Sequence, residues 1–187
     1  MRDAGWEFIG HGVHQKSIQG ETDERDVIAL AMKMIEDFTG TRPPGWLGPG
    51  LKESFDTPDI LTELGIEYVF DWVLDDLPCW MTTKNGPLLS LPYTLELNDS
   101  PVYAIERQHS SEMHDRLVDT LTVFNIELKT QPRVLTLALH PHLIGVPHRF
   151  AWLERMLDIL QAREDAVFVV GRQIADWYKA ACPPPAG

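Results

Sequence analysis

The sequence predicts an α/β fold whose strands run parallel, and three features of the chain support this prediction. Short apolar runs alternate with amphipathic segments of helical length about five times, without a detectable internal repeat. The first two helical segments begin at a capping residue or proline and end at Gly40 and Gly65. Polar side chains gather where the apolar runs end, which is typical of α/β domains with their chemistry at the carboxyl ends of strands.

The first half of the chain is expected to place two helices between short strands. Apolar residues from Val27 to Phe38 recur at three- and four-residue spacing, so they mark one face of a helix. Thr22 is the expected cap of this helix, and Gly40 the expected stop. The predicted order is strand 6–9, helix from 22 to 40, extended segment 41–50, helix 56–64 and strand 66–70.

The second half continues the alternation after a less regular stretch. For residues 81–110, the sequence predicts a turn at 84–87, one short strand and a loop. Ser110 or Ser111 should cap a helix that runs to about Leu128, and the apolar run 133–139 predicts a buried strand. A helix over 148–162, a strand over 166–170 and a last helix through Trp177 complete the order, and residues 181–187 are expected to be a disordered tail.

The composition argues against some classes of binding partner. Hydrophobic residues make up 44% of the 187 residues, which is enough for one sizeable core. The net charge of -12 argues against nucleic acid, because phosphate binding needs a basic surface. No apolar run approaches the roughly 20 residues of a membrane span, so no membrane partner is expected. Cys79 and Cys182 lack the spacing of a disulfide framework or zinc motif, and we expect a cytoplasmic protein.

Candidate functional residues lie at the ends of the predicted strands. His11, Trp46, Asp71, Asp75 and His140 come at or just after these ends. Because the carboxyl ends of parallel strands share one edge of a sheet, we expect these groups on one rim. An imidazole on such a rim can bind a metal or transfer protons, and a nearby carboxylate can fix its tautomer.

Four motifs in order resemble the polysaccharide deacetylase superfamily and, within it, the allantoinase-like branch of cyclic-ureide hydrolases. They are GHGVH at 10–14, TRPPGWLGPG at 41–50, FDWVLDDLPCW at 70–80 and LALHPH at 137–142. The similarity runs from Trp6 to about Trp177. It implies hydrolysis of C–N bonds other than peptide bonds on a distorted (β/α)7 barrel, here incomplete.

The resemblance also bears on domain organisation. The opening strand of that family, with its catalytic and metal-binding acids, precedes the equivalent of Trp6. Residues 1–180 are therefore expected to form a single catalytic domain that lacks its first strands. Either the chain is part of a longer product or another chain covers the open edge, and we expect a homo-oligomer.

Gln15 distinguishes this chain from the metal-dependent members of that family. Those members carry a second histidine four residues after the first, and the residue four after His11 is Gln15. A neutral amide is a poor replacement for an imidazole ligand, so we expect no tightly bound metal. The alternative is a zinc site in which His14, three residues after His11, replaces the missing ligand.

The predicted activity is hydrolysis of a small cyclic amide or ureide, such as allantoin. His11 or an aspartate, Asp71 or Asp75, would activate water, backbone N–H groups of the glycine-rich loops would stabilise the oxyanion, and His140 would protonate the leaving nitrogen. The candidate substrate-binding residues are Trp46, Asp76, Trp80, Glu96, Asn98 and His142.

Several of these assignments have alternatives. Asp75 and Asp76 could form a solvated turn, the two tryptophans could be core residues, and Glu96 and Asn98 could simply face solvent. Two further functions stay open for the chain as a whole. One is a metal-dependent N-deacetylase of a carbohydrate or peptidoglycan that uses His11 and His14, and the other is a non-catalytic fragment or binding module.

Overall fold

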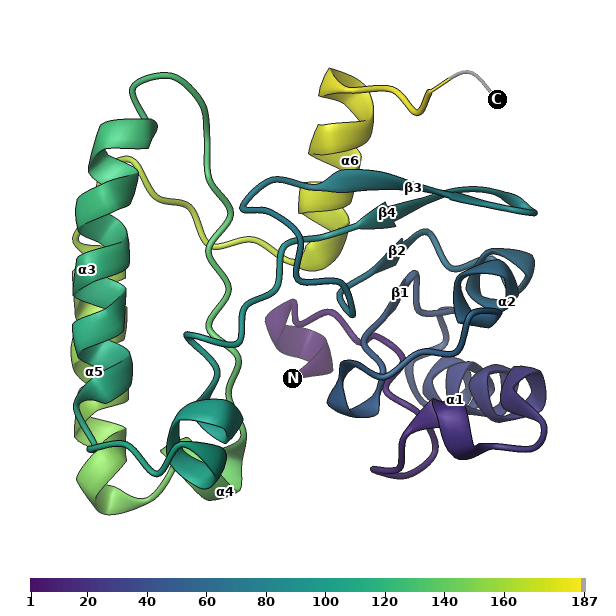
Figure 1. The fold of residues 1–187 in the computed structure, drawn as a ribbon, viewed down its shortest axis with the longest axis horizontal. Helices are drawn as coiled ribbons and strands as arrows, with labels where there is room; N and C mark the ends of the chain where they lie inside the picture. Colours follow the sequence, from purple (N-terminus) through teal and green to yellow (C-terminus); the bar gives the residue numbers. More distant parts are fainter. Residues whose placement is uncertain (186–187) are drawn as a thin grey trace. The chain divides into compact units, whose positions relative to one another are not determined.

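The computed structural model describes residues 1–185, and the chain divides into two compact units. Unit 1 comprises Met1–Pro92 and the segment from Val169 onward, and unit 2 comprises Tyr93–Phe168. The regular elements of unit 1 are α1 (Glu24–Thr39), β1 (Gly45–Trp46), α2 (Thr57–Glu63), β2 (Tyr68–Val69), β3 (Cys79–Thr83), β4 (Gly86–Ser90) and α6 (Gly171–Ala181) (Figure 1).

Unit 1 is built on an open, mixed four-stranded sheet with the order β1-β2-β4-β3. Strands β1, β2 and β4 are parallel, whereas β3 pairs with β4 as an antiparallel hairpin. The α/β class is confirmed, and the sheet does not close into a barrel. The sequence predicted a turn here but only one strand beside it, so the hairpin with its two-residue turn at Lys84-Asn85 was not predicted.

Helices cover both faces of this sheet. On one face, side chains from β1, β2 and β4 pack with α1 and α2: Trp46, Val69, Leu88, Ile28, Met32 and Leu61. On the other face, Tyr68 and Leu89 pack with Ala175 of α6. Each fully buried aliphatic side chain of this kind contributes about 1.5–3 kcal/mol relative to exposure. The two packed faces therefore hold the carboxyl ends of β1, β2 and β4 in fixed positions.

The ends of α1 show which local signals were interpreted correctly. Asp23, not the predicted Thr22, is the N-cap, and its carboxylate accepts the backbone N–H of Asp26 at 3.2 Å. Asp23 precedes the first helical residue, Glu24, so its side chain can reach this N–H. The predicted stop is confirmed, since Gly40 ends the helix with a left-handed φ of 78°.

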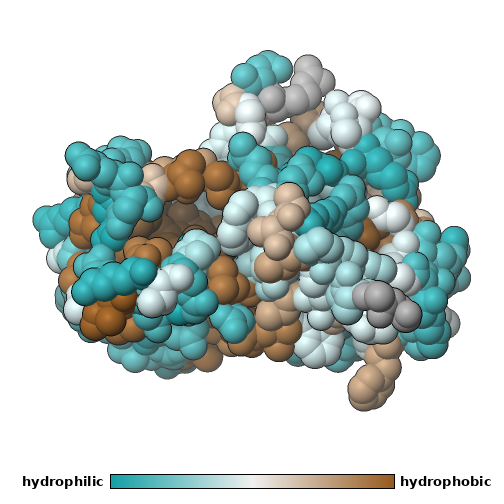
Figure 2. Space-filling view, turned by 90° about the horizontal axis from the view of Figure 1, so that it is seen from above, coloured by the Kyte–Doolittle hydropathy of each residue, from teal (hydrophilic) through white to brown (hydrophobic). Residues whose placement is uncertain are grey.

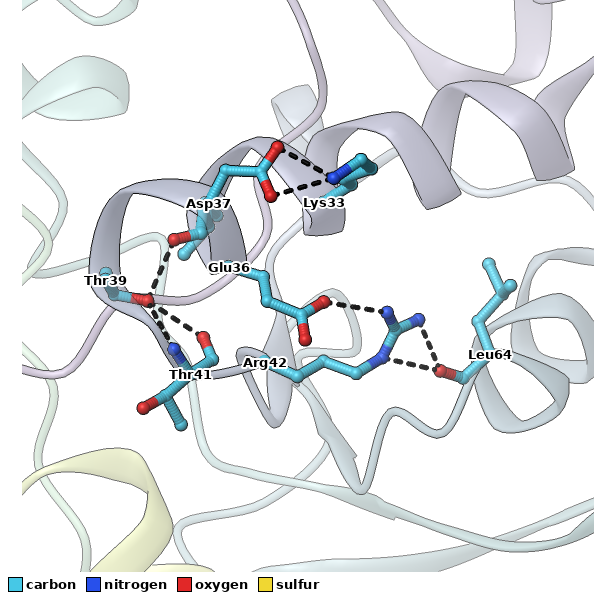
Figure 3. A network of polar contacts seen from close by, with 8 residues as sticks. Lys33, Glu36, Asp37, Thr39, Thr41, Arg42 and Leu64 are labelled. Atoms are coloured by element: carbon cyan, nitrogen blue, oxygen red, sulfur yellow. Dashed lines mark hydrogen bonds and ion pairs between the residues drawn. The ribbon is translucent and has the colours of Figure 1, made fainter.

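Arg42 links the ends of α1 and α2 within unit 1 (Figure 3). Its guanidinium donates to the Leu64 carbonyl from Nε and Nη2, at 3.3 and 2.8 Å. Nη1 also lies 3.4 Å from Glu36 Oε2. Arg42 thus satisfies a carbonyl at the end of α2 and anchors the segment that leads into β1.

Unit 2 is helical, with α3 (Glu112–Glu127), α4 (Pro141–Ile144), α5 (Pro147–Gln161) and a π-helical turn at Ser100–Ile105. Met113, Leu117 and Met156 are fully buried in its core. The predicted helices over 110–128 and 148–162 agree with α3 and α5 to within two residues at each end.

Three segments that were predicted as strands do not form strands in the structure. Residues 6–9, 133–139 and 166–170 form no ladder among the described residues, and only single bridges pair Gly10 with Trp46 and Asn98 with Ala138 nearby. Hydrophobic pattern alone cannot supply the neighbouring backbone that a strand needs. Val167 and Phe168, which lie in the predicted strand 166–170, are exposed.

The C-terminal helix is longer than the sequence predicted. Helix α6 extends to Ala181, four residues beyond Trp177, and the Cys182 carbonyl accepts the indole N–H of Trp80 at 2.8 Å. Residues 186 and 187 of the predicted tail lie outside the described residues.

Apolar side chains are interspersed with polar ones on the face shown in Figure 2. Within residues 1–185, none of the helices combines the length and apolar character required to cross a bilayer.

Candidate functional site

His11 lies at the carboxyl end of β1 in unit 1. Gly10 joins the sheet edge, because its N–H donates to the Gly45 carbonyl and its carbonyl accepts the Leu47 N–H, both at 2.9 Å. The Nδ1 atom of His11 bonds to the Leu47 carbonyl. A carbonyl can only accept, so Nδ1 carries the proton and Nε2 of the neutral ring has a free lone pair. His11 is therefore oriented as a proton acceptor at Nε2.

Asp71 follows β2 at the same edge of the sheet and is buried, with 7% of its surface exposed. Its Oδ1 accepts the backbone N–H of Gly48 at 2.6 Å. A Cβ at position 48 would lie 2.6 Å from Asp71 Oδ2, so the close approach requires glycine. Burial raises the pKa of Asp71, and the Glu53 carboxyl, the Gly48 N–H and the charge of His11 oppose that rise. This N–H is committed to Asp71 and is not free to stabilise an oxyanion.

Glu53 brings a second carboxyl group to Asp71, and sequence reasoning missed it. The Trp72 indole donates to Glu53 Oε2 at 2.8 Å, and the Gln19 amide donates to the Glu53 carbonyl at 2.5 Å. Burial, and then the hydrogen bond and charge of Asp71, raise the pKa of Glu53 to about 9. No sequence signal marked this residue, which stands in an irregular loop after the glycine-rich segment.

Unit 2 contains a second imidazole with a different partner. Asp99 is completely buried, and its Oδ1 lies 2.6 Å from Nδ1 of His140. Its Oδ2 accepts the backbone N–H of His140 at 2.7 Å. The bridge between Asn98 and Ala138 brings the two residues together, since the Asp99 N–H also donates to the Ala138 carbonyl at 3.1 Å.

The His140–Asp99 pair can transfer protons at its exposed end. The His140 side chain is 38% exposed, and its Nε2 has no hydrogen-bond partner in the part of the chain that the structure describes. A buried carboxylate on Nδ1 fixes the tautomer and stabilises the imidazolium, as an acid–base catalyst requires. Sequence reasoning chose Asn98 and Glu96 and passed over Asp99. The available signal was an acid that directly follows an extended run.

The remaining acids and tryptophans of the prediction have other surroundings in unit 1. Asp75 and Asp76 are exposed, and Asp75 accepts the Leu77 N–H at 3.2 Å within a turn. Trp46 is fully buried in the core beneath the sheet, and its indole faces Asp71. Trp80 packs beside Tyr178 of α6, with 6.4 Å between ring centroids. Asp75 and Trp80 are thus held by contacts that do not involve His11.

The predicted binding residues of unit 2 separate into two groups. Asn98 is buried, and its amide bonds to the Tyr93 hydroxyl at 3.3 Å and to the Ser100 N–H at 3.0 Å. Glu96 accepts the Thr94 hydroxyl at 2.6 Å within its own loop. These contacts indicate local structural roles. His142, in contrast, is exposed, and its ring faces that of His140 edge to face, with centroids 5.9 Å apart.

The donor groups near His11 do not fit a metal site. His14 is exposed and points its Nε2 toward Glu21 Oε1, 3.4 Å away. Gln15, also exposed, offers only an amide. Within residues 1–185, no group of three or more His, Cys, Asp and Glu side chains is arranged to hold a metal ion.

Comparisons with known proteins give one consistent fold. No family model matches the chain. A Schizosaccharomyces pombe protein named as a polysaccharide deacetylase is 30% identical over 98% of this chain. Two crystal structures are each 29% identical over 98% of it: a Pseudomonas aeruginosa protein named as a polysaccharide deacetylase, with a TM-score of 0.88, and Puue allantoinase, with a TM-score of 0.89. The chain spans 63% of the first relative and 62% of each solved chain.

Proposed function

The similarities in sequence and fold support the polysaccharide deacetylase superfamily, and from this premise we propose that the chain hydrolyses non-peptide C–N bonds. The proposed substrate is a small cyclic amide or ureide of the allantoin type. The likeness to an allantoinase over 98% of the chain supports this substrate class. The poor fit of His14 and Gln15 to a metal site supports a route in which no step passes through a metal.

The observation that carries this proposal is the hydrogen bond between Nδ1 of His140 and the buried Asp99 carboxylate. Hydrolysis of an amide requires a proton for the nitrogen that leaves. The Asp99 carboxylate keeps the ring protonated and oriented, and His140 transfers the Nε2 proton to that nitrogen as its bond to carbon breaks. The backbone bond from His140 to Asp99 keeps the imidazole in the orientation that this transfer needs.

Hydrolysis also requires a base for the attacking water, and His11 meets this requirement. Its Nδ1 is occupied by the Leu47 carbonyl, so the lone pair of Nε2 takes the proton from water. Asp71 supplies negative charge near the ring that forms. When His11 takes up the proton, the negative charge of Asp71 therefore partly compensates the positive charge of the imidazolium.

The test is turnover by the purified protein with allantoin as the substrate. We expect the wild-type chain to open the ring, and His140→Gln to lower kcat on the order of 10²–10⁴-fold. His148→Gln, at an exposed position on α5, is the matched control and should keep full turnover. Full activity of a folded His140→Gln variant would show that this histidine is not the acid.

A metal-dependent N-deacetylase is the second candidate, favoured by the names of two relatives. Its test uses an N-acetylglucosamine oligosaccharide and measures released acetate together with bound metal. Stoichiometric zinc and acetate release that stops on chelation would replace the ureide proposal. Loss of activity in His14→Ala would point the same way, because our proposal gives His14 no role.

A further inference from the structure

The two carboxyl groups of Glu53 and Asp71 compete for a limited set of hydrogen-bond donors. Trp72 donates to one oxygen of Glu53, and Gly48 donates to one oxygen of Asp71. The other two oxygens, Glu53 Oε1 and Asp71 Oδ2, are buried and make no hydrogen bond of good geometry among the described residues, and the other donor at Asp71 among them is the Trp46 indole N–H. Two buried carboxylates without a proton between them would be strongly unfavourable.

We infer that Glu53 and Asp71 share one proton, carried by Glu53 and donated to Asp71, and that Glu53 is a positioning residue for the His11 loop. With the proton on Glu53 Oε1, this oxygen donates and Asp71 Oδ2 accepts, so one hydrogen bond engages both oxygens. It also lets Asp71 stay anionic while it holds the Gly48 N–H. The carbonyl of Leu47, the residue before Gly48, in turn holds His11. The positioning role rests on the proposed function, whereas the shared proton does not.

The charged groups around the pair favour this distribution of charge. Glu53 faces Asp71 and the Glu24 carboxylate of α1, so its own ionisation would place a third negative charge there. Glu24 is held by the hydroxyls of Ser54 and Thr57, the former at 2.6 Å. Asp71 instead faces the Trp46 indole and the imidazole of His11. Asp71 is therefore the better site for the negative charge.

This arrangement makes stability depend on pH in a defined direction. Burial and Asp71 raise the pKa of Glu53 in the folded chain to about 9, above its ordinary value of 4.5. The unfolded chain therefore loses this proton at lower pH than the folded chain does. The stabilisation is complete below about pH 4.5 and is lost as pH rises to about 9.

The decisive experiment compares unfolding of the wild-type protein with that of Glu53→Gln from pH 5 to pH 9. Glutamine keeps the size of the side chain and donates an amide N–H to Asp71, but it cannot ionise. We expect the ratio of the wild-type to the variant unfolding constant to grow with pH, by at most about tenfold per unit. The control is Glu63→Gln, which removes an exposed glutamate from α2 and shows how the loss of a surface carboxylate changes the unfolding constant.

A second readout detects the proton directly. The infrared spectrum at neutral pH should contain the C=O band of a protonated carboxylic acid, and Glu53→Gln should remove it. A pH-independent ratio together with the absence of this band would overturn the shared proton. Both measurements are independent of turnover, so they stand even if the chain hydrolyses no ureide.

The positioning role has its own readout in the pH dependence of kcat. Wild-type turnover should fall on the alkaline side as Glu53 ionises, and Glu53→Gln should extend activity to higher pH. Glu53→Leu, which offers Asp71 no donor, should lose at least tenfold in kcat where Glu53→Gln does not. Equal loss in a folded Glu53→Gln variant would overturn the positioning role while leaving the infrared result intact.

Discussion

His11 and His140 are the same side chain held in two different ways. In unit 1, Nδ1 of His11 donates to a neutral backbone carbonyl, that of Leu47. In unit 2, Nδ1 of His140 donates to the carboxylate of Asp99, which is completely buried. Both partners select the same tautomer and leave Nε2 for chemistry. The difference between them is charge.

This difference separates the two roles that a histidine can take in hydrolysis. A carbonyl fixes the ring without adding a charge, so the neutral ring of His11 is suited to accept a proton. A carboxylate stabilises the imidazolium, so His140 is suited to carry a proton and release it. In the proposed mechanism, the same type of side chain thus serves as base and as acid, and the partner of Nδ1 distinguishes the two.

Removing the charge of Asp99 should have a large effect, comparable to that of removing His140 itself. Asp99→Asn keeps the size of the side chain, but its amide no longer enforces the tautomer or compensates the imidazolium. We expect kcat for ureide hydrolysis to fall on the order of 10³–10⁴-fold. Because the two residues act as one unit, adding His140→Gln should cost little more.

The control for this prediction is the surface pair of His114 and Asp115. These two residues also form a histidine–aspartate contact, at 3.0 Å, but the Asp115 side chain is 61% exposed. Asp115→Asn should leave kcat unchanged. If both asparagine variants had equal turnover, burial of the carboxylate would not be what distinguishes His140.

The second prediction concerns the base. His11→Ala should lower kcat on the order of 10²-fold or more, because water would lose its proton acceptor. His14→Ala should not, since His14 is exposed and paired with Glu21 at the surface. Initial rates measured with both variants, with circular dichroism to check folding, decide between them. Loss of activity in both would remove the contrast between the two histidines and favour a metal site.

The two histidines could be predicted from the sequence, but their partners could not. His140 directly follows an apolar run and His11 follows one after Gly10, and this local signal indicates a group at the end of a strand-like segment. Leu47 lies 36 residues from His11, and Asp99 lies 41 residues from His140. Glu53 has no distinguishing neighbour in the sequence. Such contacts depend on how distant segments pack, which composition and periodicity do not contain.

The same distinction explains which elements of the fold were predicted. Helices α3 and α5 were predicted closely, because helical hydrogen bonds and the spacing of apolar residues are local. The strands predicted at 133–139 and 166–170 are wrong, because a strand exists only when neighbouring backbone pairs with it. The β3–β4 hairpin was missed although its turn was recognised, since one of its two strands was not.

A third prediction tests whether the position of Asp71 depends on its close packing against Gly48. Gly48→Ala would place its Cβ 2.6 Å from Asp71 Oδ2, so the loop or the carboxylate must move. We expect a loss of about 1–3 kcal/mol in unfolding free energy, measured by denaturant titration, and lower kcat as well. Gly20→Ala is the control, because nothing lies within 4 Å of its added Cβ. If Gly48→Ala were as stable as Gly20→Ala, the close approach at Asp71 would not matter.

The smallest effect should come from replacing His142, whose ring contacts the ring of His140, the proposed acid. Its ring is exposed and meets His140 edge to face, and Asp99 already satisfies Nδ1 of His140. We expect His142→Gln to raise KM by about fivefold, the cost of one polar contact, and to leave kcat unchanged. His148→Gln, another exposed histidine in unit 2, should change neither constant. A fall in kcat without a rise in KM would instead mean that His142 tunes the proton of His140, and that Asp99 alone does not make His140 an acid.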